Sequence, residues 1–141
     1  MQNFTGLFKA LRWSIQLSKN WESEVNEECY TFFHPEGYGA LQISDYTKDT
    51  PITDEDIIDL IEFNEEEKLH LRKVKFGDFE GLHLVYSDEK NTFWRKWWVK
   101  NDQLLLFITY NCDVKDKEYN VNTINKMLSS LRVLNDERAK S

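Results

Sequence analysis

The sequence predicts an α+β fold, in which helices pack on an antiparallel sheet of about seven strands. Two patterns lead to this prediction. Short segments with an apolar residue at every second position are separated by brief turns, as in strands that pair in a meander. Two other segments place apolar residues at helical spacing. Because only 2 prolines and 5 glycines occur in 141 residues, we also expect mostly regular structure with short connections.

Three strands are expected in the first third of the chain. The first alternates Trp13, Ile15 and Leu17 with polar residues, and Trp21 follows it as a plug at the edge of the core. The second is rich in aromatic and β-branched residues, and a turn at 35–39 joins it to the third as an antiparallel hairpin. The expected strands cover residues 12–18, 28–34 and 40–46.

A helix is expected after Pro51. Thr53 is a suitable N-cap, and Asp56 stands three residues later, which is a variant of the capping box. Ile57, Leu60 and Ile61 then share one face of the helix, and the helical pattern fades after residue 63.

Four further strands should follow as a meander. The last of them is apolar on both faces, so we expect a central strand that is covered on both sides. The expected strands cover residues 69–76, 79–87, 92–100 and 104–110.

The chain should close with a helix over residues 116–134, followed by a flexible polar tail at 136–141. An apolar stripe at helical spacing defines this helix. The stripe consists of Val121, Ile124, Leu128, Leu131 and Leu134. The predicted order is therefore β-β-β-α-β-β-β-β-α, in a single domain over residues 1–135.

Composition and charge disfavour several classes of partner. The chain has 25 acidic and 18 basic residues and a net charge of −7, which disfavours nucleic acid and anionic membranes as partners. The N-terminus lacks the pattern of a signal peptide, and the longest apolar run, 104–108, is too short to cross a bilayer. These features predict a cytoplasmic protein, in which Cys29 and Cys112 are free thiols.

Three segments resemble the PsbP-like fold, which is shared by a Ran-interacting Mog-type protein and many uncharacterised bacterial domains. They are residues 13–17 with Trp21, residues 39–44, and residues 106–110 together with the closing helix that ends at 128–132. Residues 81–86 and 94–98 are most similar to small uncharacterised bacterial proteins. The resemblance implies an antiparallel sheet with packed helices and a role in binding or assembly, and it implies no catalytic residue.

The segment 94–98, WRKWW, contains the strongest candidates for partner contact, because Trp and Arg dominate interface hot spots. The alternative is that one face of this strand lies in the core and the other lies under a helix. If Trp98 is a contact residue, Trp98→Ala should weaken binding and leave the melting temperature nearly unchanged. The predicted contact residues are Trp94, Arg95, Trp97, Trp98 and Tyr38.

Residues 54–67 contain eight acidic residues and no basic one. Such a cluster could steer a basic protein partner to the molecule, or it could be an ordinary solvated helix face. The predicted acidic rim consists of Asp54, Glu55, Glu62 and Glu66.

No motif for catalysis or metal binding is visible. His34, His70 and His83 are scattered and do not have the spacing of zinc ligands, and the chain has no nucleophile elbow, P-loop or dinucleotide-binding glycine pattern. We therefore expect no enzymatic activity and no cofactor, although an unrecognised enzyme that uses Cys112 or His83 is one alternative.

The sequence thus predicts a non-catalytic module that binds another protein, of the adaptor or immunity type. The alternative is a carrier or sensor for a small molecule, with an aromatic pocket between the sheet and the terminal helix.

Overall fold

A computed structural model of the protein describes residues 4–27, 29–61 and 70–134, and in these residues it has two antiparallel sheets and two α-helices. This architecture confirms the predicted α+β class. The smaller sheet has the strand order β1-β2-β10. Its strands are β1 (Phe4–Lys9), β2 (Trp13–Ser18) and β10 (Arg132–Val133).

The larger sheet has seven strands in the order β3-β4-β5-β9-β8-β7-β6, and every neighbouring pair is antiparallel. β9 is the fourth of the seven, which confirms the prediction of a central strand from its apolar composition. The strands are β3 (Glu22–Val25), β4 (Tyr30–Phe33), β5 (Ala40–Thr47), β6 (Arg72–Phe76), β7 (Phe79–Ser87), β8 (Thr92–Asn101) and β9 (Leu104–Asp113).

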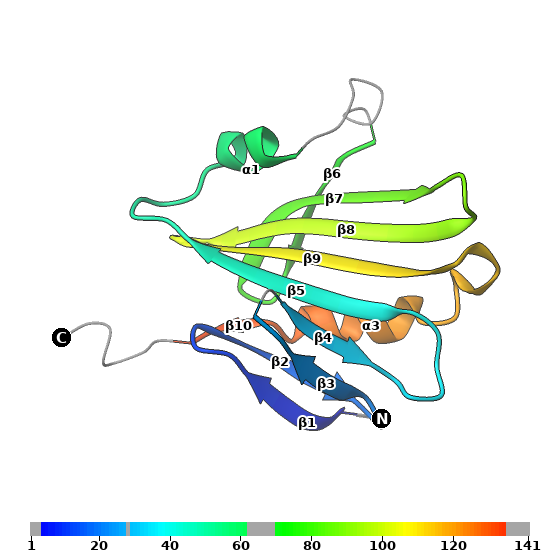
Figure 1. Ribbon diagram of the computed structural model, residues 1–141. Helices are drawn as coiled ribbons and strands as arrows, with labels where there is room; N and C mark the ends of the chain where they lie inside the picture. Colours follow the sequence, from blue (N-terminus) through cyan, green and yellow to red (C-terminus); the bar gives the residue numbers. More distant parts are fainter. Residues whose placement is uncertain (1–3, 28, 62–69, 135–141) are drawn as a thin grey trace.

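The helices lie on opposite faces of the large sheet (Figure 1). α3 (Val121–Ser129) and the small sheet cover one face, and α1 (Asp54–Leu60) lies over the other. A short 3-10 turn, η1 (Val114–Asp116), precedes α3. The main core lies between the large sheet, α3 and β2, where Trp13, Trp97, Ile108 and Leu128 are almost completely buried.

The large sheet has the expected number of strands, but they are not the seven strands that the sequence predicted. The strand over 13–18 belongs to the separate small sheet, and β3 takes the seventh place in the large one. β3 was missed because all four of its residues are exposed, so its sequence lacks the apolar alternation of a half-buried strand. β1 was also missed.

The closing helix is shorter than predicted at both ends. η1 occupies the expected beginning, and after Ser130 the chain turns and pairs with β2 through Arg132 and Val133. Leu131 is completely buried and Val133 is partly buried against the main core. The apolar stripe therefore continued past the helix at Leu131, because this residue also faces the core. The predicted tail at 136–141 lies outside the described residues.

Candidate functional site

Strand β8 supplies different side chains to the two faces of the large sheet. Trp94, Lys96 and Trp98 point toward the face that carries α1, because side chains alternate along a strand. The cross-strand neighbours of Trp98 on this face are Leu82 of β7 and Phe107 of β9. The Trp98 and Phe107 rings are stacked with their centroids 5.4 Å apart, and together they form an aromatic floor.

α1 is held over one end of this floor. Thr53 caps the helix: its Oγ1 accepts from the Asp56 N–H at 3.1 Å, and Asp56 Oδ2 accepts from the Thr53 N–H at 2.9 Å. This geometry confirms the predicted capping box. Ile57 is completely buried in a small second core with Ile52, Leu105 and Trp98.

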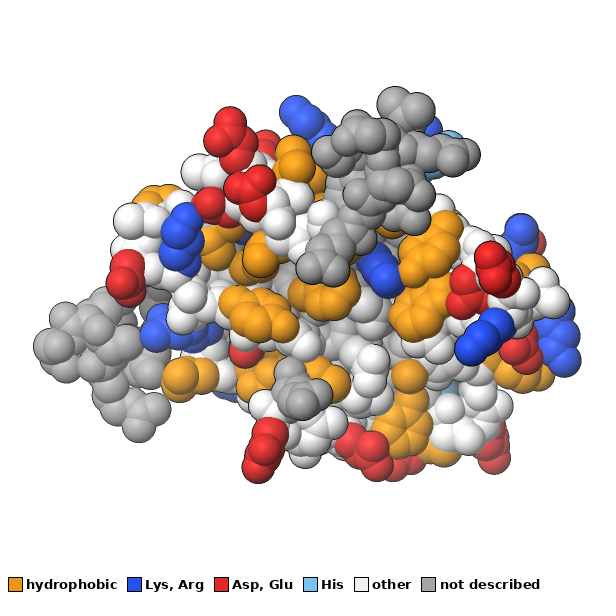
Figure 2. All heavy atoms as spheres, turned by 45° about the horizontal axis from the view of Figure 1, so that its top comes forward, with side chains coloured by type: hydrophobic (Ala, Val, Ile, Leu, Met, Phe, Trp, Pro, Cys, Tyr) orange, Lys and Arg blue, Asp and Glu red, His pale blue; other side chains and the backbone are white. Residues whose placement is uncertain are grey.

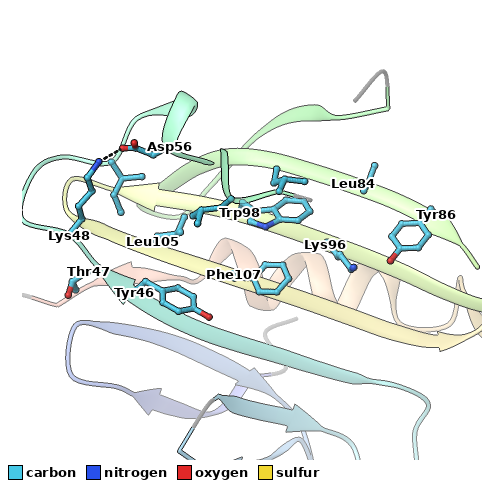
Figure 3. Close-up of a pocket in the computed structure, with 13 residues that line it drawn as sticks. Tyr46, Thr47, Lys48, Asp56, Leu84, Tyr86, Lys96, Trp98, Leu105 and Phe107 are labelled. Atoms are coloured by element: carbon cyan, nitrogen blue, oxygen red, sulfur yellow. Dashed lines mark hydrogen bonds and ion pairs between the residues drawn. The ribbon is translucent and has the colours of Figure 1, made fainter. Parts of the chain in front are cut away.

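The space between α1 and the sheet is a hollow of about 760 Å³, which we call the α1 hollow (Figure 3). Its volume is in the range of pockets that bind small molecules. Figure 2 shows this face of the molecule, where hydrophobic side chains gather in the middle and charged side chains surround them. The lining residues are Tyr46, Thr47, Lys48, Ile52, Asp56, Leu60, Ile61, Leu84, Tyr86, Lys96, Trp98, Leu105 and Phe107.

One end of the α1 hollow carries an ion pair. Lys48 Nζ lies 2.8 Å from Asp56 Oδ2 (Figure 3). The pKa of Asp56 is lowered, mainly by the hydrogen bond from Lys48 and then by the hydrogen bond from the Thr53 N–H. Asp56 is therefore ionised at neutral pH, and its charge offsets that of Lys48.

The other end carries a lysine between two aromatic rings. The rings of Tyr86 and Trp94 are nearly parallel, with centroids 6.4 Å apart. Lys96 Nζ lies 5.2 Å from the centroid of Tyr86 and 5.1 Å from that of Trp94, within the range of cation–π attraction. The indole N–H of Trp94 donates to Asp88 Oδ2 at 3.1 Å, and this hydrogen bond fixes the orientation of the Trp94 ring.

Comparison with known proteins identifies a shared fold. No protein-family model and no curated protein matches the sequence. A crystal structure from Bacteroides thetaiotaomicron has a TM-score of 0.65 at 15% identity over 88% of this chain. LpqN, a protein involved in cell envelope biogenesis of Mycobacterium tuberculosis, has a TM-score of 0.56 at 11% identity over 87% of this chain. These likenesses show the fold alone.

The present chain spans 46% of the Bacteroides thetaiotaomicron chain and 83% of LpqN. Among the described residues, no helix is long and apolar enough to cross a membrane. In the same residues, no group of three or more His, Cys, Asp and Glu is placed to hold a metal ion.

The structure brings only two of the predicted aromatic contacts to the α1 side of the sheet, Trp94 and Trp98. Arg95 and Trp97 point to the opposite face, where they are 8% and 1% exposed beside α3. The structure therefore buries these two predicted contacts, and Trp98 on the other face is buried to the same degree, at 7% exposure. The alternative interpretation of the WRKWW segment holds for them, because the strand has a helix over each face.

Arg95 and the half-buried His83 both pack on the ring of Trp97. The His83 ring lies 4.8 Å from the Trp97 ring and parallel to it, and the Arg95 guanidinium lies 4.6 Å from the Trp97 ring centroid. Arg95 Nη2 donates to Asn125 Oδ1 at 2.7 Å. Burial, and then the charge of Arg95, lower the pKa of His83 to about 4. We interpret this stack as structural, since Arg95 and Trp97 are buried and His83 is half-buried beside them.

The remaining predicted contacts are dispersed. Asp54 and Glu55 are exposed in the first turn of α1, next to the α1 hollow. Tyr38 lies in the β4–β5 turn, where its ring contacts Tyr119 edge to face and its carbonyl accepts from the Tyr110 hydroxyl at 3.0 Å. The predicted residues Glu62 and Glu66 lie outside the described residues.

Sequence reasoning missed most of the residues that line the α1 hollow. The alternation of residues 92–100 already grouped Lys96 with Trp94 and Trp98, so its face was readable from the sequence. Tyr46, Phe107 and Tyr86 come from three other strands, and only the strand order brings them to the same face. The two cysteines are free, with Cys112 buried and Cys29 half-buried, as predicted.

Proposed function

We propose that the protein is a non-catalytic binding protein that holds a small, largely apolar molecule in the α1 hollow. The observation that carries this proposal is the hollow itself, about 760 Å³ in volume and floored by the stacked rings of Trp98 and Phe107. Aromatic side chains offer a large apolar surface to a ligand and lose little conformational entropy when it binds. A few polar groups at the margin of the pocket then orient the ligand. The expected pocket was between the sheet and the terminal helix. The hollow lies instead beneath the first helix.

The test is a titration with N-phenyl-1-naphthylamine, an uncharged aromatic probe that fluoresces in apolar sites. We expect saturable binding of one probe per protein. Phe107→Ala should weaken it several-fold, because this half-exposed ring is part of the floor. The matched control is Tyr119→Ala, which removes an exposed ring away from the hollow and should change nothing. Absence of saturable binding by the unaltered protein would refute the proposal.

A second candidate is the binding of another protein, as an adaptor or immunity-type module. The outer surface of α1 favours it, because Ile58 is an exposed apolar residue beside Asp54 and Glu55 of the acidic first turn. A basic partner would be attracted to this turn. In an affinity capture from the native host, a stoichiometric basic protein released by salt would support this candidate, provided that the double variant Asp54→Asn, Glu55→Gln loses it.

We also propose that the fold is PsbP-like. The order of β5, α1 and the β6–β9 meander, followed by α3, supports this assignment. LpqN is involved in cell envelope biogenesis, so a role at the envelope competes with the cytoplasmic location that the sequence predicts. Fractionation of the native host, with detection of the untagged protein, distinguishes the two locations.

A further inference from the structure

Among the residues that the structure describes, the charged groups that line the α1 hollow leave one positive charge without an acidic partner. The charged residues in this described lining are Lys48, Asp56 and Lys96. Lys48 and Asp56 form an ion pair at 2.8 Å and offset each other. Among the ion pairs between described residues, none includes Lys96. The described lining is therefore cationic by one charge, in a protein whose net charge is −7.

Lys96 is positioned by its neighbours. The Tyr86 and Trp94 rings attract its ammonium group, and they have no negative charge that would neutralise it. Lys96 lies at the end of the α1 hollow opposite to Lys48 and Asp56, with Trp98 and Phe107 between the two ends (Figure 3). A molecule on the aromatic floor can thus extend one group to Lys96.

We propose that the α1 hollow takes a small amphipathic acid, with its apolar body on Trp98 and Phe107 and its anionic head against the ammonium group of Lys96. A carboxylate, sulfonate or phosphate head would accept a charge-assisted hydrogen bond from Lys96 Nζ. This inference rests on the proposed function, because it names the chemical class of the ligand for the same site.

The hollow favours a free small molecule over a membrane surface as the source of this acid. α1 stands over one end of the floor as a wall, and its first turn carries Asp54, Glu55 and Asp56. An anionic bilayer that covered this whole face would also meet the exposed carboxylates of Asp54 and Glu55, and like charges repel. A single small acid avoids them, because it needs to place only its head at the far end of the hollow.

The test compares two probes that differ by one acidic group. 8-Anilinonaphthalene-1-sulfonate is N-phenyl-1-naphthylamine with an added sulfonate. We expect the unaltered protein to bind the sulfonate more tightly than the uncharged probe, with one site for each. Lys96→Met keeps most of the aliphatic stem and should lower the affinity for the sulfonate by roughly tenfold or more, as expected for loss of a hydrogen bond to a charged group. Its affinity for the uncharged probe should stay within about twofold, since the apolar floor is kept.

Two further variants act as controls. Lys96→Arg keeps the charge and should retain the preference for the sulfonate. Lys100→Met removes a lysine from the same face of β8, but Lys100 lies near Asp54 at 3.6 Å and Glu80 at 3.7 Å, so its charge is already offset. We expect this variant to bind both probes as the unaltered protein does. Salt should weaken binding of the sulfonate in the unaltered protein and have little effect in Lys96→Met.

The outcomes separate this inference from the proposed function. Equal affinities of the unaltered protein for the two probes, or an equal loss of both in Lys96→Met, would overturn the inference and leave the binding function intact. Absence of binding of both probes would overturn both. Dodecanoate that displaces the bound sulfonate more effectively than 1-dodecanol would support the inference. Co-sedimentation with phosphatidylglycerol vesicles, without binding of either soluble probe, would overturn it in favour of a membrane surface.

Discussion

Trp98 and Trp94 lie four residues apart on the same face of β8, with Lys96 between them, but they differ in what surrounds them. Trp98 is 7% exposed and packs with Ile57, Leu84 and Leu105 in the second core, whereas Trp94 is half-buried at the open end of the α1 hollow. Burial and not residue type therefore decides what each indole contributes to stability.

Trp98→Ala should lower the free energy of unfolding by about 3 kcal/mol, because it leaves a large cavity beneath α1. The sequence-based expectation was an unchanged melting temperature, and the burial of Trp98 reverses it. Urea denaturation measures the change, with Trp94→Ala as the matched control. We expect the control to lose roughly 1 kcal/mol, mainly from the indole hydrogen bond to Asp88. Equal losses in the two variants would contradict this argument.

His83 should make stability depend on pH. Its pKa is about 4 in the folded protein against 6.5 for a free histidine, because burial and the charge of Arg95 disfavour the imidazolium. The unfolded chain therefore binds a proton first as the pH falls. The stability that neutral His83 contributes is complete above pH 6.5 and is lost between about 6.5 and 4, by at most roughly 1.4 kcal/mol per pH unit.

The variant His83→Phe tests this dependence, because it keeps a ring to stack on Trp97 and removes the titrating group. As the pH falls from 6.5 to 4, the unfolding free energy of the unaltered protein should decrease relative to that of His83→Phe. Parallel profiles over this range would show that His83 does not titrate with folding.

At the scale of single elements, α1 depends on its cap. Thr53→Ala removes the side-chain oxygen that accepts from the Asp56 N–H, and loss of such a cap costs about 1 kcal/mol. We expect amide exchange at Ile57, whose N–H donates to the Thr53 carbonyl, to become roughly fivefold faster. Binding of N-phenyl-1-naphthylamine should weaken as well, because α1 walls the hollow. Thr50→Ala, at an exposed position before the helix, should change neither quantity.

The elements that the sequence predicted well are those with a regular burial pattern. β7, β8 and β9 lie within three residues of their expected ranges, because β7 and β8 alternate side chains between the two faces of the sheet and β9 is apolar on both faces. β3 has no buried residue and β10 has two residues in all, so neither has a pattern to detect. The Leu131–Leu134 segment satisfies helical spacing as well as the extended conformation that it adopts, and only pairing with β2 decides between them.

At the scale of the whole molecule, the candidate site follows from the strand order. β5 pairs with β9, which places Tyr46 opposite Leu105, and β9 pairs with β8, which places Phe107 opposite Trp98. These contacts join residues far apart in the sequence, so no local pattern could predict the hollow. Local alternation did group the three β8 residues of this face. It could not show which face of β8 is completely covered, because α3 and α1 reach the sheet from distant parts of the chain.

The two edges of the large sheet are charged in opposite senses. β3 carries the exposed residues Glu22 and Glu24 at one edge, and β6 carries the exposed residues Arg72, Lys73 and Lys75 at the other. An edge strand offers unpaired backbone groups to a second chain, and charged side chains, especially lysine, prevent such pairing. We therefore interpret the lysines of β6 as protection against edge-to-edge association.

Replacing two of these residues should expose the edge. The double variant Lys73→Val, Lys75→Val leaves β6 rich in β-branched residues, and we expect it to associate as its concentration rises, measured by sedimentation velocity. Lys115→Val, Lys117→Val is the matched control, because it removes two exposed lysines at the same spacing but at η1, away from the sheet edges. Association of both variants to the same extent would attribute the effect to net charge and not to the edge. Association of the double β6 variant alone would show that β6 is kept free by its own lysines, since the control has the same net charge and the same added apolar surface.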